Sequence, residues 1–270
     1  MRKFITLALA LIIAVSLAAC SQGGNSAAGG EGQNAAEKLV FGTSADYPPF
    51  EFHILQDGED KIVGFEVALA YRIAEDMGRP LEVVDMNFDN LLTLMAKGDC
   101  DFVIAAMEAT PERLESSSAS DPYYTDLPAM ILTKKANLDQ YTSLDSFSGK
   151  TVGAQSGSTK VDIITDEMPG AEPLVMASVV DLVNNLVYDK CDALVLDGAV
   201  ALQYADANSD LAVVEAVPLG DALPYCVWVA KDDPLGLLPG INETIAKVLS
   251  DGSMEKFIEE ADKLLAEGQN

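Results

Sequence analysis

The sequence predicts an α/β protein made of two similar α/β lobes that a two-strand hinge connects. Short apolar runs alternate with amphipathic stretches from residue 38 onwards, which is typical of strands followed by helices. The alternation starts again near Gly149. A local pattern in residues 88–104 also recurs in residues 179–195, at an offset of 91 (179 − 88), so the two halves are expected to share one design.

The first half is expected to form a mostly parallel sheet with helices on its faces. Its apolar patterning predicts strands over residues 39–41, 81–86 and 101–107, and helices over residues 66–77 and 90–97. Gly78 suits the end of the longer helix, and Pro80 prevents its continuation.

The second half repeats this order of elements. Its expected strands cover residues 151–154, 174–177, 192–196 and 211–217. Apolar runs at residues 128–133 and 223–230 flank this half, and we expect the chain to cross between the lobes there. Residues 242–267 are expected to form two amphipathic helices separated by Asp251 and Gly252, with an apolar stripe used for packing.

The N-terminus has the features of an export signal. Arg2 and Lys3 precede an apolar run that ends in small residues before Cys20, and this run is shorter than the ~20 residues of a membrane-spanning helix. Residues 1–19 are therefore expected to be a signal peptide. Leu-Ala-Ala-Cys also resembles the bacterial lipobox, which implies a lipid on Cys20; the alternative is an ordinary signal followed by a chance Cys.

The expected division of the chain follows from these features. Residues 20–37 contain almost no bulky side chain and are expected to form a flexible tether behind the lipidated Cys. Lobe 1 is expected to be discontinuous, over residues 38–127 and 226–270. Lobe 2 is expected over residues 128–225, with the hinge crossings at its ends.

Composition argues against several classes of function. The pI of about 4.1 and the formal charge of −26, which becomes −28 (−26 − 2) without residues 1–19, speak against nucleic acid. His53 is the single histidine, and Cys100, Cys191 and Cys226 lie far apart, so neither a metal site nor a cofactor is expected. These three thiols are expected to be buried and inert.

One cationic residue stands where open α/β sheets bind ligands. Residues 110–113, Thr-Pro-Glu-Arg, follow the expected strand 101–107 and have the cap and first-turn residues of a helix. Arg113 would then lie at the carboxyl edge of the sheet and could hold a carboxylate. The alternative is a surface Arg on a short helix.

Two further features stand at the corresponding edge in the second half. Asp197 closes the strand 192–196 and could hold an ammonium group, although it could equally cap the next helix. The loop 155–159, Gln-Ser-Gly-Ser-Thr, follows another strand, and its N–H groups could cradle a carboxylate. Such a Ser/Gly loop is by itself a weak signal.

A series of short motifs follows the same order as in a known family. They are residues 42–50, 64–67, 110–113, 121–124, 149–153 with Gly157, 192–197 and 251–253. Through them residues 38–267 resemble the bacterial extracellular solute-binding proteins of the polar amino acid type (family 3), substrate-binding lipoproteins of ABC transporters. The resemblance implies a periplasmic-binding-protein type II architecture.

The resemblance also implies roles for individual residues. Arg113 would clamp the carboxylate of the ligand together with the backbone at Thr159 and Ser158, and Asp197 would hold the ammonium from the second lobe. Further contacts implied by the family pattern come from the rings of Tyr47 and Phe88 around the ligand side chain, and from the backbone carbonyl of Ala106. Core packing is the alternative for both rings.

The chain departs from the family pattern at Glu108, where a Ser or Thr is usual. A Glu would repel a ligand carboxylate, so Glu108 turns away, pairs with Arg113, or signals a different ligand. Ser44 and Ala105 lie where selectivity for the side chain is often set. Glu66 could meet a basic ligand tail, but a Glu at a helix start is favourable without any ligand.

The resemblance therefore implies an exported receptor that closes on a free polar or basic L-amino acid and delivers it to the permease of an ABC importer. It would be a monomer, anchored by its lipid on the outer face of the cell membrane, or periplasmic where an outer membrane exists. The alternatives are a cyclohexadienyl dehydratase-like enzyme, which Arg113 and Asp197 oppose and Glu108 favours, and a sensor's ligand domain. A sensor would normally continue into a membrane helix beyond Asn270.

Overall fold

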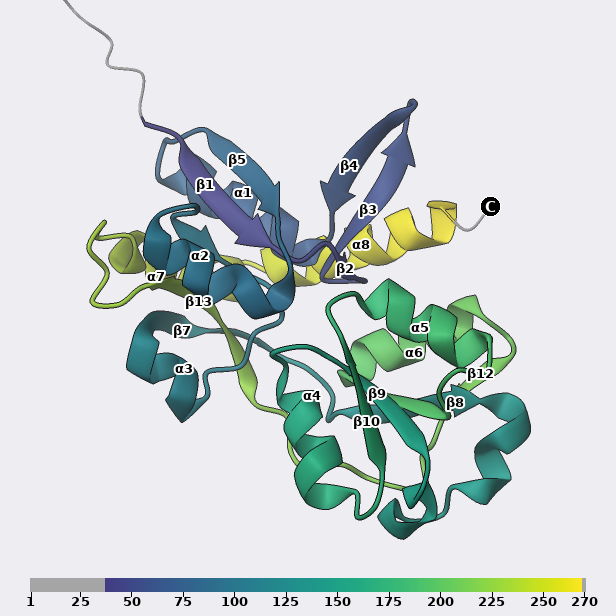
Figure 1. Ribbon diagram of the computed structural model, residues 1–270. Coiled ribbons are helices and arrows are strands. Elements are labelled where there is room, and N and C mark those ends of the chain that lie inside the picture. Colours follow the sequence, from purple (N-terminus) through teal and green to yellow (C-terminus); the bar gives the residue numbers. More distant parts are fainter. Residues whose placement is uncertain (1–36, 269–270) are drawn as a thin grey trace, which may run out of the picture. The chain divides into compact units, whose positions relative to one another are not determined.

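The computed structural model describes residues 37–268. The expected signal peptide, Cys20 and nearly all of the expected tether lie outside this part of the chain. The described strands form two five-stranded sheets and one three-stranded sheet (Figure 1). The first sheet has the order β5 (Leu81–Asp85), β1 (Leu39–Thr43), β6 (Phe102–Val103), β13 (Pro224–Ala230) and β7 (Ser117–Thr125). The second has the order β10 (Glu172–Met176), β9 (Thr151–Gln155), β11 (Ala193–Leu196), β8 (Met130–Lys134) and β12 (Leu211–Val213).

The two five-stranded sheets share one pattern of strand directions. Strand β1 is parallel to β5 and β6, whereas β13 is antiparallel to both β6 and β7. In the same way, β9 is parallel to β10 and β11, whereas β8 is antiparallel to β11 and β12. In each sheet four of the five strands therefore run in one direction, and the expectation of a mostly parallel sheet in the first half is confirmed; the exceptions are β13 and β8. Parallel neighbours need a crossover connection, whereas β13 and β8 enter their sheets straight from the other lobe.

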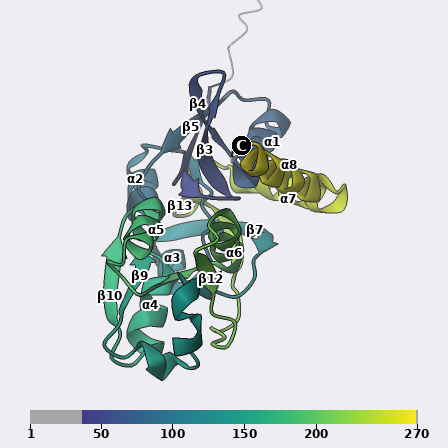
Figure 2. The same cartoon turned by 90° about the vertical axis from the view of Figure 1, so that its right-hand side faces the viewer.

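Helices flank both sheets. Those of the described chain are α1 (Phe65–Asp76), α2 (Leu91–Lys97), α3 (Pro111–Ser116), α4 (Thr159–Asp162), α5 (Val179–Val187), α6 (Gly198–Ala207), α7 (Leu238–Ser250) and α8 (Ser253–Gly268). Further helical turns are η1 (Phe88–Asn90), η2 (Lys135–Gln140), η3 (Leu144–Phe147) and η4 (Ile163–Glu167). Helix α1 packs against α7 and α8 in the first lobe, and α5 and α6 contact the second sheet (Figure 2).

The repeat seen in the sequence has a matching structural role in both lobes. The carboxylate of Asp101 accepts a hydrogen bond from the N–H of Val40 in β1 at 2.8 Å, and Asp192 accepts one from Thr151 in β9 at 2.8 Å. The offset between these aspartates is 91 (192 − 101), the offset of the sequence pattern. Each Asp lies directly before a strand, β6 or β11, and ties the start of this strand to its parallel neighbour, β1 or β9. The prediction of two similar α/β lobes is confirmed.

The hinge consists of two antiparallel segments that lie side by side. At the end of β7, Thr125 pairs with Pro224 and Tyr124 pairs with Tyr225 at the start of β13. The first segment leads from lobe 1 into β8, and the second returns from lobe 2 into the first sheet (Figure 1). A hinge of two strands, as predicted, therefore connects the lobes.

Three elements differ from the sequence-based expectations. The strand expected over residues 101–107 is confined to Phe102–Val103, and Ala106, three residues further on, has a left-handed backbone (φ 44°) that a strand does not contain. The strand expected over residues 211–217 ends at Val213. A three-stranded sheet of β2 (Asp46–Tyr47), β3 (Glu51–Gln56) and β4 (Glu59–Val63) was not anticipated, although Asp57-Gly58, with φ of 56° and 82°, is a typical hairpin turn.

The three thiols in the described chain are free and buried, as expected. Burial raises the pKa of Cys100 to about 12 and the pKa of Cys191 and Cys226 to about 11, so all three stay protonated at neutral pH. Among residues 37–268, no helix has the length and apolar character needed to cross a bilayer.

Candidate functional site

Arg113 is held at the cleft by the start of α3. The Thr110 side chain accepts a hydrogen bond from the Arg113 N–H at 3.3 Å, and Pro111 occupies the first helical turn. The guanidinium donates from Nη1 to the carboxylate of Glu108 at 3.0 Å and from Nη2 to the carbonyl of Gly157 in the other lobe at 3.0 Å. Its Cζ lies 5.6 Å from the centre of the Phe88 ring. Arg113 therefore contacts both lobes and is not a free surface side chain.

Asp197 occupies the corresponding position in the second lobe. It lies between β11 and α6 and is 6 % exposed. Its Oδ2 accepts a hydrogen bond from the hydroxyl of Tyr47 at 2.6 Å, and this hydroxyl in turn accepts one from the Asp197 N–H at 3.2 Å. The carboxylate is thus fixed by a ring from the other lobe.

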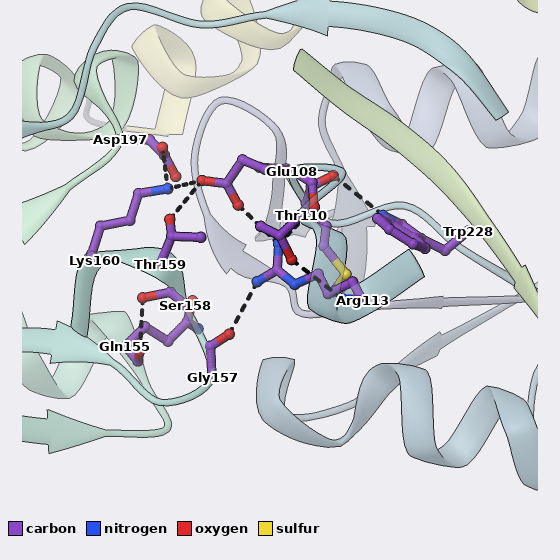
Figure 3. A network of polar contacts seen from close by, with 12 residues as sticks. Glu108, Thr110, Arg113, Gln155, Gly157, Ser158, Thr159, Lys160, Asp197 and Trp228 are labelled. Carbon is purple, nitrogen blue, oxygen red and sulfur yellow. Dashed lines mark hydrogen bonds and ion pairs between the residues drawn. The ribbon is translucent and has the colours of Figure 1, made fainter. Parts of the chain in front are cut away.

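Lys160 and Glu108 join these two ends into one network (Figure 3). The ammonium of Lys160 lies 2.5 Å from Oδ1 of Asp197 and 2.5 Å from Oε1 of Glu108. The hydroxyl of Thr159 also donates to Oε1 of Glu108, at 2.8 Å. Charges therefore alternate along the chain from Arg113 through Glu108 and Lys160 to Asp197, and their sum is zero.

Glu108 and Lys160 are held in their charged forms by the charges around them. Burial raises the pKa of Glu108, but the charges of Lys160 and Arg113 outweigh it and lower the pKa to about 2. Burial lowers the pKa of Lys160, but Asp197 and Glu108 outweigh it and raise the pKa above its ordinary value. Burial and Asp197 raise the pKa of Tyr47 well above its ordinary value, so it stays a hydroxyl that can donate.

Two cavities open along this network, and both lobes line each of them. The first, of about 500 Å³, is lined by Phe88 and Arg113 from one lobe and by Gly157 and Thr159 from the other. The second, of about 190 Å³, is lined by Glu108, Lys160, Asp197 and Thr159, together with the segment 219–223. Thr159, which donates a hydrogen bond to Glu108, borders both cavities.

Further polar contacts hold the lobes together beside the network. Asp46 accepts a hydrogen bond at 2.7 Å from the Val179 N–H at the start of α5. Ser156 donates to Asp89 at 2.9 Å. Asp126, in the first hinge segment, accepts a hydrogen bond at 3.2 Å from the N–H of Ala199 in the first turn of α6. Burial and the nearby Asp197 raise the pKa of Asp126 to about 6.

The structure brings five of the expected site residues together and places the others differently. Arg113, Glu108, Thr159, Asp197 and Tyr47 belong to one connected network, and Phe88 lies against Arg113. The Ser158 hydroxyl is turned to the carbonyl of Gln155 in its own loop, at 2.8 Å. Ser44 is buried, and its hydroxyl lies 3.4 Å from Asp46.

Glu66 lies beneath the site and supports its backbone. Its side chain is fully buried, accepts hydrogen bonds from the Ala106 N–H at 2.9 and 3.0 Å, and accepts another from the hydroxyl of Tyr123. Ala106 has the left-handed φ of 44° that turns the chain from β6 towards Glu108. The carboxylate of Glu66 thus fixes the bend from which the site residues 108–113 follow.

Sequence reasoning missed Lys160. It follows the Ser/Gly loop directly, and nothing in its sequence neighbourhood distinguishes it from an exposed Lys in a first helical turn. It is 4 % exposed, which is rare for Lys unless its charge is paired. Across residues 37–268, no group of three or more His, Cys, Asp or Glu side chains is placed to hold a metal ion.

The comparisons with known proteins define the class. Residues 39–261 match the family model described as bacterial extracellular solute-binding proteins, family 3, and the chain belongs to this family. It is similar to the arginine-binding extracellular protein ArtP of Bacillus subtilis, with 35 % identity over 264 residues, 95 % of this chain and 96 % of that protein. It is also similar to the ABC transporter arginine-binding protein 1 of Escherichia coli, with 31 % identity over 84 % of this chain and 91 % of that protein.

A solved structure gives the same result for the fold. The amino acid ABC transporter substrate-binding protein AbpA of Streptococcus pneumoniae, bound to L-arginine, superposes with a TM-score of 0.80. It is 31 % identical and covers 84 % of this chain and 95 % of its own. The type II architecture expected from the resemblance is confirmed.

Proposed function

We propose that this protein is an extracellular receptor that closes on a free amino acid and delivers it to an ABC importer. The observation that carries the proposal is the position of Arg113 and Asp197, which reach one charged network across the cleft from opposite lobes. A guanidinium and a carboxylate placed in this way suit the two charged ends of an amino acid. Closure of residues 128–225 onto residues 38–127 and 226–270 would complete the contacts.

We propose a basic ligand, with L-arginine as the first candidate. Three exposed carboxylates, Asp89, Glu112 and Asp162, line the first cavity together with the single cation Arg113. Phe88 lines the same cavity, and an aromatic ring there suits a guanidinium or ammonium group. Relatives named as arginine-binding proteins support the same choice.

Calorimetry on residues 38–270, after unfolding and refolding to strip bound ligand, tests this function. We expect L-arginine and a small number of other amino acids to bind. Arg113→Ala and Asp197→Ala should each weaken binding at least 30-fold, because each leaves a buried charge without its partner (roughly 2–5 kcal/mol). Arg72→Ala, on the outside of α1, is the matched control and should bind as the wild type does. No binding of any amino acid would contradict the proposal.

A dehydratase-like enzyme is the second candidate, and in it Glu108 would act as the general acid. A general acid at neutral pH needs a raised pKa, whereas the pKa of Glu108 is lowered to about 2. We therefore propose binding rather than catalysis. Incubation of the refolded protein with prephenate and arogenate checks this point, and turnover that Glu108→Gln abolishes would favour the enzyme.

We also propose that the chain is exported and anchored by a lipid on Cys20, with residues 1–19 as its signal and residues 20–37 as its tether. The Leu-Ala-Ala-Cys sequence and the family both support this proposal. Metabolic labelling with a fatty acid should mark the wild type and not Cys20→Ser, and this variant should be released from the membrane fraction.

We propose that the protein is a monomer. Light scattering on residues 38–270 should therefore give the mass of a single chain.

A further inference from the structure

Two side chains of the protein itself contact the groups that the proposed function assigns to the ligand. The carboxylate of Glu108 accepts from Arg113 at 3.0 Å and from Thr159 at 2.8 Å, where the carboxylate of a free amino acid is expected. The ammonium of Lys160 contacts Asp197 at 2.5 Å, where the ammonium of the amino acid is expected. Both subsites of the clamp therefore hold groups of the same chemistry as the ligand.

The two groups also have the arrangement of an amino acid zwitterion. Nζ of Lys160 and Oε1 of Glu108 lie 2.5 Å apart, which is direct contact (Figure 3). In a free amino acid the ammonium and the carboxylate are attached to one carbon and are close neighbours in the same way. Here one charge comes from each lobe, so the pair bridges the cleft as a ligand would.

Burial separates this pair from an ordinary surface ion pair. The side chains of Lys160 and Glu108 are 5 % and 7 % exposed, and the charges around them keep both ionised. Exposed ion pairs contribute little to the stability of a protein. Breaking a buried pair is costly, because it leaves a buried charge without compensation. The bridge between the lobes is therefore expected to resist opening.

An incoming zwitterion cannot simply add to this network. Its carboxylate would stand beside Glu108 and its ammonium beside Lys160, and like charges at such distances repel strongly in a buried site. The two side chains must leave Arg113 and Asp197 before the ligand reaches them. Because both side chains are tethered, they compete with the ligand for Arg113 and Asp197 at a high effective concentration. The apparent affinity for the ligand is therefore reduced to the extent that the Glu108–Lys160 pair occupies these two residues.

We propose that the Glu108–Lys160 pair is a built-in substitute for the charged ends of the amino acid, which bridges the lobes and which the ligand displaces from Arg113 and Asp197. This inference rests on the proposed function. It makes Lys160 and Glu108 determinants of specificity. Only an amino acid whose side chain adds further contacts displaces the pair, and glycine or alanine, with little side chain, does not.

The test replaces both members with uncharged side chains and leaves the net charge unchanged. The variants are E108T/K160S and, with side chains closer to the original size, E108Q/K160Q. The matched control is E243T/K247S, which removes an exposed ion pair of 2.9 Å within α7. Circular dichroism establishes that each variant is folded.

Small-angle X-ray scattering on refolded residues 38–270, without added amino acid, measures the radius of gyration and so reports whether the lobes are held together. The wild type and the control should have a radius of gyration near the ~17–18 Å of a compact chain of this length. Both cleft variants should have a larger value. Calorimetry measures the affinity for L-arginine, which depends on displacement of the pair. L-arginine should bind the cleft variants at least ten-fold more tightly than the wild type.

Each outcome decides one proposal. An unchanged radius of gyration in the cleft variants, or weaker binding of L-arginine by them, overturns the built-in substitute. A larger radius of gyration in these variants, with no amino acid bound by any of the proteins, supports the Glu108–Lys160 pair as a bridge between the lobes. It contradicts the proposed receptor function instead. Binding by the wild type with equal affinity in all variants overturns the displacement and leaves the receptor function intact.

Discussion

Tyr47 and Asp197 are 150 positions apart in the sequence and share two hydrogen bonds across the cleft. The hydroxyl of Tyr47 donates to the carboxylate of Asp197 at 2.6 Å and accepts from its backbone N–H at 3.2 Å. The same carboxylate contacts Lys160 through its other oxygen at 2.5 Å. The orientation of Asp197, in the second lobe, is therefore set by a ring from the first lobe.

Tyr47→Phe should weaken ligand binding without unfolding the protein. It removes the donor to Asp197 and leaves the Asp197 N–H without its acceptor, which costs about 1–3 kcal/mol. We expect about ten-fold weaker binding of L-arginine and a lower melting temperature in thermal unfolding. Tyr71→Phe, at an exposed position on α1, is the control and should change neither quantity. Unchanged binding by Tyr47→Phe would contradict the role of this hydroxyl.

Gly157→Ala should impair closure more than stability. Gly157 has a φ of +77°, and an added Cβ would lie 3.0 Å from the backbone of Asp89 in the other lobe. Gly78→Ala is a matched control, because Gly78 has a similar φ of +64° and nothing within 4 Å of an added Cβ. Both changes should cost roughly 1–2 kcal/mol in backbone strain, read by denaturant unfolding. Only Gly157→Ala should also weaken L-arginine binding. Equal binding by the two variants would contradict a functional role for the close approach of Gly157 to Asp89 across the cleft.

Ala106→Gly should be nearly neutral or stabilising, although the residue is buried. Its φ of 44° is strained for Ala, and Gly relieves roughly 1 kcal/mol or more of this strain. Ala154→Gly is the comparison, at a fully buried position in β9, and should destabilise the protein by about 1 kcal/mol. Chemical denaturation measures both. A loss of stability in Ala106→Gly as large as that in Ala154→Gly would show that strain at residue 106 is negligible.

Glu51→Gln should change how stability depends on pH. Glu51 is 1 % exposed, its Oε2 has no hydrogen-bond partner, and burial together with Glu66 raises its pKa well above the ordinary value of 4.5. A raised pKa in the folded state means that the stability contributed by this group is complete below pH 4.5. It is lost as the pH rises towards the folded pKa.

Replacing this carboxyl group with an amide removes that loss. The free energy of unfolding of Glu51→Gln, relative to the wild type, should therefore increase between pH 5 and pH 8, by about 1–3 kcal/mol. Urea unfolding at the two pH values measures the difference. The exposed Glu59→Gln in β4 is the control and should show no such trend. A constant difference between the two pH values would mean that Glu51 titrates normally.

The elements that sequence reasoning found are those with a local signal. The helix over residues 66–77 follows from a one-sided apolar face and a terminating Gly78, and it is observed as Phe65–Asp76. The start of α3 follows from Thr110 and Pro111, which cap and open a helix whatever the rest of the chain does. The parallel neighbours of β1 follow from the alternation of strands and helices, whereas the antiparallel direction of β13 depends on how the chain crosses the hinge and has no local signal.

The candidate site was predictable only in part for the same reason. Arg113 and Asp197 stand at strand ends, and the topology of an α/β sheet places strand ends at the binding edge. The role of Glu108 was left open between turning away, pairing with Arg113 and signalling another ligand. In the structure Glu108 pairs with Arg113 and also with Lys160, which lies 52 positions further along the chain. No local pattern contains such a pairing.

The sequence by itself determined the two similar α/β lobes, their shared aspartate at residues 101 and 192, and the helix start that presents Arg113. Periodicity and caps are local signals, and the repeat is found by comparing two stretches of the same chain. Only the tertiary structure decided that Lys160 lies between Glu108 and Asp197, and that Glu66 supports Ala106 beneath the cleft. The pairing of charged side chains depends on their distances and on their burial in the folded protein, and neither quantity follows from the order of the residues in the sequence.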